Sequence, residues 1–491
     1  MKSLYYLLRL YILILSHMSL KVTDPVLYGL IDEETHRQND SLEMIASENF
    51  TSESVMECLG SVLTNKYSEG YVGKRYYGGN KVIDKIEGLC ISRTLNAFSL
   101  DNNDWGVNVQ PYSGSIANLA VYNALLEPGD KIMGMGLTSG GHLTHGFYTD
   151  KKKISVSSIY YNSLQYHIKD DGYIDYDKLE QEVKSFKPKL IIYGGSAYPR
   201  DFDHERFRMI ANSVNSYLMC DMAHNAGLIA AGELISPFAH SDIVTTTTHK
   251  TLRGPRAGMI FFKKEFEKKI NESVFPGIQG GPHQNQIAAI CRQMEEVSTP
   301  EYKEYIRNVT LNAKTFANEL TSMGFKLVTG GTDTHQVLID LKGFGINGSK
   351  VEKVADLVGI TINKNTVFGD KSALSPSGVR IGTPALTTRG MKENEFKEIA
   401  YIFDKVVKLG ISAQDNNGKM PLKDFTNNLN MNFTQDINDI KNDIGNITAR
   451  FPLHKPKFPQ ILPVIQQKAS TNKIYAPLNF MKGFKFIRKL L

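Results

Sequence analysis

Short apolar runs alternate with longer stretches of helical periodicity over most of this chain. Residues 131–136, 190–194 and 259–262 are three such runs, rich in Ile, Leu, Met and Phe and short enough for single strands. Continuous apolar runs of this length are typical of strands that are buried on both faces. The alternation therefore predicts an α/β fold with helices on both sides of a sheet.

A long helical pattern marks the predicted division of the chain. Residues 302–323 indicate one connecting helix, and Gly324 follows as a stop signal. A smaller α/β region then opens near residue 326 and contains the apolar run 337–341. With 491 residues, the chain has material for more than one core. We predict an N-terminal arm at 24–49, a large domain at 50–300, and a small C-terminal domain with its linking helix at 301–459.

The composition is that of an ordinary globular protein, with 41% hydrophobic and 22% charged residues. Its net charge of +6 is concentrated at the ends: residues 1–23 contribute +3 and residues 460–491 contribute +6, so the body carries −3. A nucleic-acid enzyme is expected to have a basic body, which argues against nucleic acid as a partner. The four cysteines form no CxxC pair, which indicates a reducing compartment and no structural metal.

The two ends of the chain carry predictions of their own. Residues 1–23 are apolar and basic and contain no acid, and the run 4–15 is too short and too interrupted to span a membrane. We predict a mitochondrial transit segment here, with a secretory-type signal as the alternative and a cytosolic form that starts at Met18. In the basic tail at 460–491, Phe480, Phe484, Ile487 and Leu491 share a helical face. That face suits a membrane surface or a protein partner, and docking on the protein itself or disorder are the alternatives.

The run SDIVTTTTHKTLRGPR at residues 241–256 carries the clearest candidate for chemistry. Its threonines suit a strand or the exit from one, and Lys250 follows them among hydroxyl and cationic side chains. An amine crowded by positive groups can lose its proton near neutral pH and attack a carbonyl carbon. We interpret Lys250 as a Schiff-base lysine rather than a solvated loop residue.

Two upstream features supply what a cofactor of such a lysine needs. Asp221 ends the apolar run 216–221, and a carboxylate there can pair with the protonated ring nitrogen of pyridoxal phosphate. Ser113, Gly114 and Ser115 form a small-residue turn at a helix start. Taken alone, such a turn is usually a plain helix cap, but its N–H groups and the helix dipole can also hold a phosphate.

A metal site was the other possibility for this region. His142 and His145 could indicate one, but the sequence shows no further ligand set that completes it, so we predict no metal.

These residues belong to a dense set of motifs at 42–49, 64–79, 140–146, 241–256, 275–282 and 377–384. With them, the chain resembles the serine hydroxymethyltransferase family from about residue 20 to about residue 459. The resemblance implies an α/β fold of the fold-type-I, aspartate-aminotransferase-like kind. Its large domain is expected to contain a mostly parallel seven-stranded sheet, followed by a smaller C-terminal α/β domain. It also implies that serine and tetrahydrofolate are interconverted with glycine and 5,10-methylenetetrahydrofolate through an external aldimine of pyridoxal 5'-phosphate.

The resemblance assigns a role to each residue that matches a family motif. Lys250 is the internal aldimine lysine, Asp221 faces the pyridine nitrogen, and His142 stacks on the ring. The other implied cofactor contacts are His224, Ser196, Thr247, Ser113, Gly114 and Ser115, with Tyr67 and Gly281 from a second subunit.

Substrate contacts follow from the same resemblance. Arg380 binds the amino-acid carboxylate, a bidentate task that suits a planar guanidinium. Glu69 is the implied acid/base carboxyl near the hydroxymethyl group and the folate, and His249 tunes substrate choice. The remaining implied contacts are Ser47 and Tyr77 for the amino acid, with Tyr77 from the neighbour, and Leu137, Gly141 and Asn365 for the folate. Serine, glycine and folate are the expected ligands of a homodimer or tetramer with shared sites.

Two other functions stay open at this point. One is a folate-independent pyridoxal-phosphate aldolase, such as a threonine aldolase, against which the folate-side motifs argue. The other is a non-catalytic subunit of a heteromeric hydroxymethyltransferase. Intact Lys250, Asp221, Arg380 and Glu69 argue against it, because a scaffold does not need them.

Overall fold

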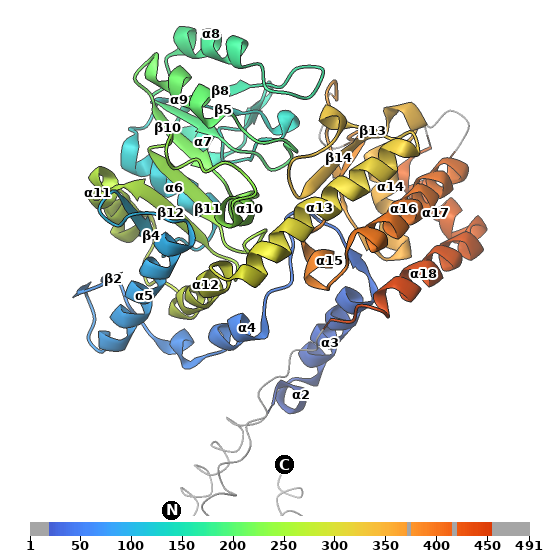
Figure 1. Ribbon diagram of the computed structural model, residues 1–491, viewed down its shortest axis with the longest axis horizontal. Helices are drawn as coiled ribbons and strands as arrows, with labels where there is room; N and C mark the ends of the chain where they lie inside the picture. Colours follow the sequence, from blue (N-terminus) through green and yellow to red (C-terminus); the bar gives the residue numbers. More distant parts are fainter. Residues whose placement is uncertain (1–18, 371–374, 415–419, 454–491) are drawn as a thin grey trace, which may run out of the picture. The chain divides into compact units, whose positions relative to one another are not determined.

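The computed structural model describes residues 19–370, 375–414 and 420–453 (Figure 1). Our predictions for residues 1–18, including the start at Met18, and for the tail at 460–491 lie outside these ranges. The chain divides into two units, of which residues 36–453 form the larger. The first helices, α2 (Leu20–Thr23) and α3 (Pro25–Asp40), bury none of their residues. None of the described helices is both long enough and apolar enough to cross a membrane.

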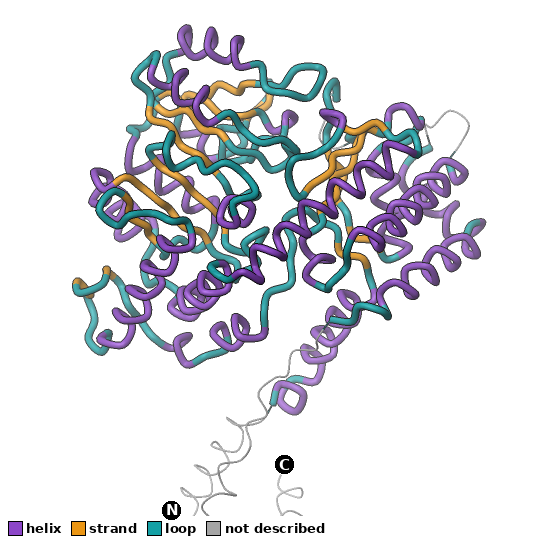
Figure 2. Tube along the Cα trace, in the orientation of Figure 1, coloured by secondary structure: helices purple, strands orange, loops and turns teal. Residues whose placement is uncertain are grey.

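A seven-stranded sheet organises the first part of the larger unit (Figures 1 and 2). Its strands β11, β10, β9, β5 and β8 run parallel to one another, while β12 is antiparallel to both β11 and β4. The order across the sheet is β4 (Trp105–Asn108), β12 (Gly258–Lys263), β11 (Ile243–Thr247), β10 (Tyr217–Asp221), β9 (Leu190–Tyr193), β5 (Lys131–Met135) and β8 (Asn162–Tyr166). The prediction of a mostly parallel sheet of seven strands is confirmed.

Helices cover both faces of this sheet, because successive strand residues point to opposite sides. Val244 and Phe261 pack into one apolar core, whereas their neighbours Ile243 and Ile260 pack into another. The first core includes residues of α5 (Lys81–Ala97), α8 (Tyr176–Phe186), α9 (His204–Asn212), α10 (Ala226–Ala231), α12 (Gln284–Val297) and the first half of α13 (Pro300–Ser322). The second core contains α6 (Gly114–Leu125) and α11 (Glu267–Glu272).

A second, antiparallel sheet follows in the order β13 (Lys326–Leu327), β14 (Gln336–Asp340), β17 (Gly378–Gly382) and β16 (Asn363–Asn365). Its core is shared with α14 (Gly348–Val358), α16 (Glu393–Ala413), α17 (Leu422–Asn432) and α18 (Thr434–Thr448). The predicted connecting helix is α13 (Pro300–Ser322), and Gly324 beyond it has a φ of +90°. The separate cores of the two sheets support our proposal of a large domain at 50–300 and a small domain at 301–459.

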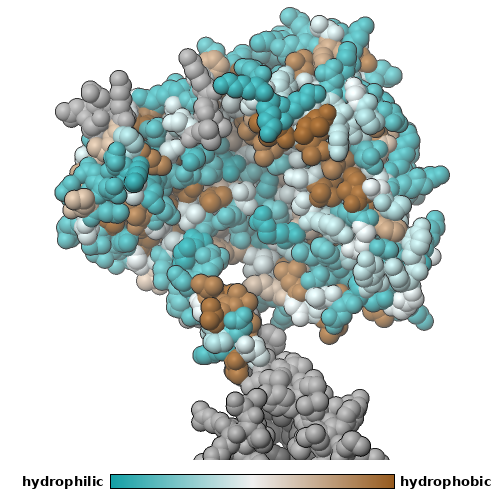
Figure 3. Space-filling model, turned by 180° about the vertical axis from the view of Figure 1, so that it is seen from behind, coloured by the Kyte–Doolittle hydropathy of each residue, from teal (hydrophilic) through white to brown (hydrophobic). Residues whose placement is uncertain are grey.

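The remaining elements are short helices and paired strands. The helices are α4 (Glu53–Leu59), α7 (Val156–Tyr160), α15 (Pro384–Thr388) and the π-helical segment η4 (Ser273–Ile278), with the 3-10 segments η1 (Val62–Asn65), η2 (Leu137–Ser139), η3 (Lys264–Phe266), η5 (Val328–Gly330) and η6 (Lys342–Phe344). Three pairs of short strands form separate small sheets: β1 (Leu42–Glu43) with β15 (Ile360–Thr361), β2 (Gly70–Tyr71) with β3 (Lys74–Arg75), and β6 (Tyr148–Thr149) with β7 (Lys152–Lys153). On the face shown in Figure 3, hydrophilic side chains predominate and hydrophobic ones gather in several patches.

One glycine on β17 allows the segment after β1 to lie directly against the small sheet. The Gly382 N–H donates to the Met44 carbonyl at 2.8 Å. A Cβ on Gly382 would lie 2.3 Å from the Ala46 Cα, a distance that real Cβ atoms essentially never show. Because Gly382 has no side chain, the chain after Ala46 can lie close enough for Ser47 and Glu48 to line the cavity described below.

Candidate active site

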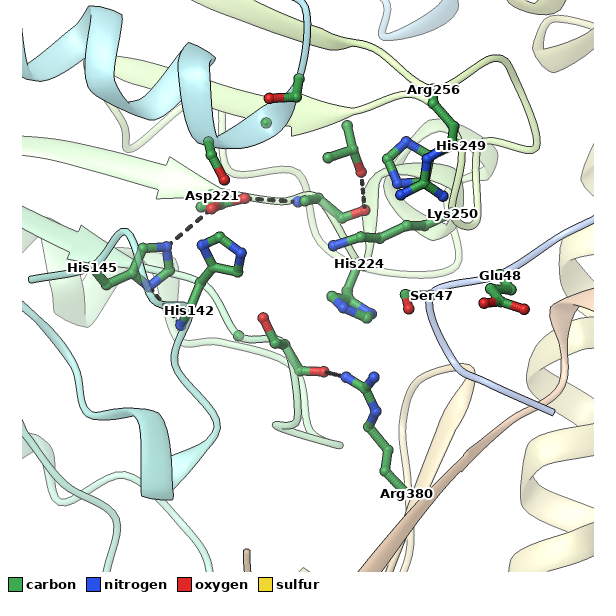
Figure 4. Close-up of a pocket in the computed structure, with 17 residues that line it drawn as sticks. Ser47, Glu48, His142, His145, Asp221, His224, His249, Lys250, Arg256 and Arg380 are labelled. Atoms are coloured by element: carbon green, nitrogen blue, oxygen red, sulfur yellow. Dashed lines mark hydrogen bonds and ion pairs between the residues drawn. The ribbon is translucent and has the colours of Figure 1, made fainter. Parts of the chain in front are cut away.

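A cavity of about 370 Å³ lies where β10 and β11 end and α6 begins. Ligands gather at the carboxyl ends of strands in open α/β sheets. The cavity is lined by Ser47, Glu48, Ser113, Gly114, Ser115, His142, His145, Gly195, Ser196, Asp221, Ala223, His224, Thr247, His249, Lys250, Arg256 and Arg380 (Figure 4). These come from segments far apart in sequence and include most of the residues predicted to bind the cofactor.

Lys250 reaches this cavity three residues beyond the end of β11. Burial lowers the pKa of its amine from 10.5 to about 8; the Asp221 carboxylate opposes this shift, and Arg380 and Arg256 add to it. With such a pKa, roughly a tenth of the amine is neutral at pH 7. The predicted nucleophile is therefore reactive near neutral pH without a separate base to deprotonate it.

Asp221, the last residue of β10, is held as a carboxylate by a set of donors. Its Oδ2 accepts from His145 Nε2 at 3.0 Å and from Asn118 Nδ2 at 2.8 Å, and its Oδ1 accepts from the Ala223 N–H at 3.1 Å. Burial works against ionisation, but the hydrogen bond and charge of His145, with Asn118, hold the pKa of Asp221 well below its usual range. The group can therefore pair with a protonated ring nitrogen.

His142 stands beside this carboxylate as a neutral ring. Burial, aided by the neighbouring His145, lowers the pKa of His142 from 6.5 to about 4. Its Nδ1 accepts from the Thr144 N–H at 3.2 Å, which fixes the orientation of the imidazole. A neutral, oriented ring at the cavity wall can stack on a flat aromatic cofactor.

The reason for predicting no metal at His142 and His145 was wrong in one respect. The sequence offered no third ligand for His142 and His145, but the fold brings Asp221 to them, and potential ligand atoms of all three lie within 4.8 Å of one another. Asp221 is 76 residues from His145, so the sequence could not show the grouping. The hydrogen bonds from His145 and Asn118 already occupy Oδ2 of this carboxylate.

The start of α6 forms a cradle for an anion. Ser113 is the N-cap residue, but its hydroxyl makes no capping hydrogen bond, and the first turn holds no acidic residue. A Cβ on Gly258 would lie 2.5 Å from the Ser113 carbonyl oxygen, so β12 packs tightly under the turn. The N–H groups of this 12-residue helix and its dipole thus face the cavity without an internal anion.

Arg380 enters the cavity from β17 of the small sheet, opposite Lys250 (Figure 4). Its Nε donates to Asn363 Oδ1 at 3.0 Å and its Nη1 donates to the Ser196 carbonyl. No described carboxylate forms an ion pair with it, and burial lowers the pKa of its guanidinium to about 10. A buried cation without an anion is costly, so the site favours a ligand carboxylate.

His249 and His224 complete the wall around Lys250. Burial, with the charges of Arg256 and Lys250, lowers the pKa of His249 to about 3, and its Nδ1 has no hydrogen-bond partner among the described residues. Burial, with Lys250 and Arg380, also holds the pKa of His224 well below its usual value. Both rings are therefore neutral and can offer one donor and one acceptor each.

Four predicted site residues lie outside this cavity and form a second group. The rings of Tyr67 and Tyr77 meet edge to face at 5.1 Å, and a Cβ on Gly281 would lie 3.2 Å from the Tyr67 ring. A Cβ on the neighbouring Gly280 would lie 3.1 Å from Glu69 Oε1. The group is joined to the cavity edge by Tyr112, whose hydroxyl donates to the Gly281 carbonyl at 2.8 Å. Its role from a second subunit stays a prediction.

The predicted folate contacts also lie beside the cavity rather than in its wall. Leu137 is in η2, Gly141 follows this turn, and Asn365 ends β16. Thr366 Oγ1 donates to the Thr138 carbonyl at 3.3 Å, so these two segments meet. Their contact with folate stays a prediction.

Several residues in the cavity wall or directly behind it were missed in the sequence. His145 and Asn118 position Asp221, Arg256 lowers the pKa of Lys250, and Glu48 lines the wall. Glu48 and His145 lie inside the motifs at 42–49 and 140–146, so these motifs could have identified them as site residues. Asn118 carried no signal, because its contact with Asp221 spans 103 residues.

The groups described above fit the parts of pyridoxal phosphate. An anionic carboxylate suits its protonated ring nitrogen, a helix start suits its phosphate, and a partly neutral lysine suits its aldehyde. In a seven-stranded, mostly parallel sheet, this combination defines a class: the fold-type-I enzymes that depend on pyridoxal phosphate.

Comparison with known proteins narrows the class. Residues 20–403 match the family described as serine hydroxymethyltransferase. The chain is 53% identical over 452 residues to serine hydroxymethyltransferase 4 of Arabidopsis thaliana, covering 89% of this chain and 95% of that protein. It is 49% identical over 453 residues to the cytosolic enzyme of Oryctolagus cuniculus (88% and 94%) and 51% identical over 420 residues to the mitochondrial enzyme of Schizosaccharomyces pombe (82% and 86%). The chain belongs to the serine hydroxymethyltransferase family, whose members use pyridoxal phosphate and take tetrahydrofolate as cosubstrate.

The pKa of Lys250 gives a testable pH dependence. In the cofactor-free protein, we expect the rate of its reaction with the aldehyde pyridoxal to rise with pH to a midpoint near 8, because the neutral amine forms well below the usual 10.5. Asp221→Asn is expected to lower this midpoint, since the lost carboxylate favours the charged amine. Borohydride trapping over a pH series measures the rate, with Lys250→Ala as the background. A midpoint near 10.5 would contradict this view of the site.

Proposed function

We propose that this chain interconverts serine and tetrahydrofolate with glycine and 5,10-methylenetetrahydrofolate, using pyridoxal 5'-phosphate. The observation that carries the proposal is the pairing of two groups across one cavity. Lys250 offers an amine with a lowered pKa, and Arg380 offers a buried guanidinium without a carboxylate partner among the described residues. The carboxylate of an α-amino acid can pair with Arg380, and Lys250 would hold the cofactor aldehyde close to its amino group. Family membership supports the choice of serine and glycine.

The residues of this chain divide the work by position. When bound, the cofactor supplies an electron sink for the bond that breaks at the amino-acid Cα. Arg380 would bind the substrate carboxylate and so fix the orientation of the bonds at Cα. Lys250 Nζ can take up or release a proton beside Cα, since its two forms are both populated near pH 8. Asp221 stays ionised and would therefore stabilise a proton on the ring nitrogen of the cofactor.

The roles of the outer residues follow from their place beside this centre. We propose that Glu69 acts as acid/base toward the serine hydroxymethyl group and the folate, and that Leu137, Gly141 and Asn365 hold the pteridine and its linker. The contact between the 137–139 turn and residue 366 supports one folate-binding edge formed by both domains. Neither the aldolase nor the scaffold reading gains support from the relatives, whose names are all serine hydroxymethyltransferase.

The proposed reaction can be tested by absorption spectroscopy on the purified, cofactor-loaded protein. We expect a red-shifted band with glycine that requires tetrahydrofolate and is absent from Lys250→Ala, because that variant lacks the amine beside Cα. The same variant is expected to cleave serine at least about a hundredfold more slowly. A bound cofactor with no response to tetrahydrofolate would instead favour a folate-independent aldolase.

We also propose that two copies of the chain complete each other's sites. Residues 56–89 expose eight large apolar or aromatic side chains, namely Met56, Val62, Tyr67, Val72, Tyr76, Tyr77, Val82 and Leu89. Such a concentration is typical of a surface covered by a partner. It includes Tyr67 and Tyr77, which lie outside the cavity of their own chain, so a dimer that covers this surface supplies them to the neighbour.

Shared sites predict complementation between two inactive variants. Lys250→Ala removes a group of the home subunit and Glu69→Gln a group of the proposed neighbour, so a mixed dimer keeps one intact site. We expect co-expression to restore about a quarter of wild-type activity, since about half the dimers are mixed and each has one working site. Each variant expressed alone is the control. A mixture as inactive as its parents would mean that each chain forms its own site.

We propose that residues 1–23 direct the chain to mitochondria. The support is their basic, acid-free composition and the mitochondrial name of one relative. Other relatives are named cytosolic and chloroplastic. Fluorescent fusions that begin at Met1 and at Met18 test the proposal. We expect a mitochondrial signal from the first and a cytosolic one from the second, and identical distributions would contradict it.

A further inference from the structure

A buried histidine outside the cavity wall joins the small sheet to the cofactor site. His335 stands directly before β14 and is fully buried. Its Nε2 lies 3.1 Å from the Ala46 carbonyl oxygen and 3.3 Å from His224 Nδ1. The two imidazole rings are nearly parallel, with an interplanar angle of 15° and centroids 5.5 Å apart.

These contacts determine where the protons are. A carbonyl oxygen can only accept, so His335 must carry its proton on Nε2 and donate it toward Ala46. His224 Nδ1 faces the same N–H at 3.3 Å and must therefore be the acceptor, without a proton. A neutral imidazole has one N–H, so the proton of His224 is left on Nε2.

Both rings are kept neutral by what surrounds them. Burial and the charges of Arg380 and Lys250 lower the pKa of His335 to about 3, although the Ala46 carbonyl opposes the shift. His224 is faced by Lys250, Arg380, His335 and His142, and burial is the largest cause of its lowered pKa. Protonation of either ring would place another cation among these groups, so both rings stay uncharged near neutral pH.

The backbone of His335 fixes it with respect to the small sheet. Its carbonyl accepts from the Thr383 N–H at 3.1 Å, next to Gly382, where the segment of Ala46 lies against β17. His224 follows β10 of the large sheet and lines the cavity, and no described residue hydrogen bonds to its Nε2. One imidazole thus connects the small sheet, the segment that carries Ser47, and a ring of the large domain.

We propose that His335 is a positioning residue that holds His224 in its Nε2–H tautomer, so that His224 presents a hydrogen-bond donor to the cavity. The inference rests on the proposed function for the identity of the acceptor, which is an oxygen on the cofactor ring. A donor there favours the ionised form of that oxygen. His224 in the other tautomer would present a lone pair to the oxygen and repel it.

The first test uses the unmutated, cofactor-free protein. Histidine labelled with ¹⁵N on the ring reports directly which nitrogen carries the proton. His224→Gln and His335→Gln identify the two sets of signals by their loss. We expect both rings to be neutral near pH 7, with the proton on Nε2 in each. A proton on Nδ1 of His224, or a charged ring, would overturn the proposal.

The second test compares variants that differ in their ability to donate. The amide of His335→Gln can still donate to Ala46 and His224, whereas His335→Met has similar bulk and no donor. We expect the methionine variant to bind pyridoxal phosphate roughly three- to tenfold more weakly, the value of one hydrogen bond. We also expect it to shift the pH midpoint of the bound cofactor's absorption change upward. The glutamine variant is expected to stay close to the wild type in both measurements.

A matched control separates positioning from general damage. Gln336 is the next residue, is also buried, and donates from Nε2 to the Tyr198 carbonyl at 3.1 Å across the same two domains. Gln336→Met is expected to lower the melting temperature without moving the His224 signals or the absorption midpoint. Equal effects of His335→Gln and His335→Met, or a Gln336→Met effect equal to that of His335→Met, would overturn the positioning role.

The tautomer is measured without cofactor and does not depend on the reaction. A protein that shows the expected ring protons but no response to glycine and tetrahydrofolate would overturn the proposed function while leaving the His335–His224 arrangement in place.

Discussion

The site depends on one carboxylate, that of Asp221, which stays ionised although most of its side chain is buried. Three donors make this possible: the ring of His145, the amide of Asn118 and the backbone of Ala223. Its negative charge opposes the lowering of the pKa of Lys250, whose ammonium form it favours, and of His142. If Asp221 took up a proton, the cavity would lose the negative charge that balances its cations. The helices and strands around β10 can thus be understood as the scaffold that supplies those donors.

Arg380 presents the opposite case, a buried charge without a described ion-pair partner. Burying a cation in this way costs stability, and its hydrogen bonds to Asn363 and Ser196 recover part of that cost. A substrate carboxylate would supply the anion that Arg380 lacks among the described residues, whereas the charge of Lys250 is already offset in part by Asp221. The pocket therefore favours a substrate with a carboxylate before any contact with its side chain is considered.

Much of the architecture could be predicted because the strands of the large sheet are short, continuous apolar runs and their ends carry the functional groups. Asp221 ends β10 and Lys250 follows the adjacent parallel strand β11, so their meeting follows from the fold class. The contacts that tune them could not be found this way. Asn118 and Asp221 are 103 residues apart, and His224 and His335 are 111 residues apart. Such pairs depend on helix placement and on the docking of one sheet against another, which local periodicity does not encode.

Helix α13 has a further consequence for how this protein unfolds. Its first half, with Tyr302, Ile306 and Val309, belongs to the core of the large sheet, and its second half, with Phe316 and Leu320, belongs to the core of the small sheet. Melting either core would remove the packing that keeps one end of the helix formed, so the loss would spread to the other. The two sheets therefore lose their structure together, and a ligand that binds at the large sheet also protects the small one from proteases.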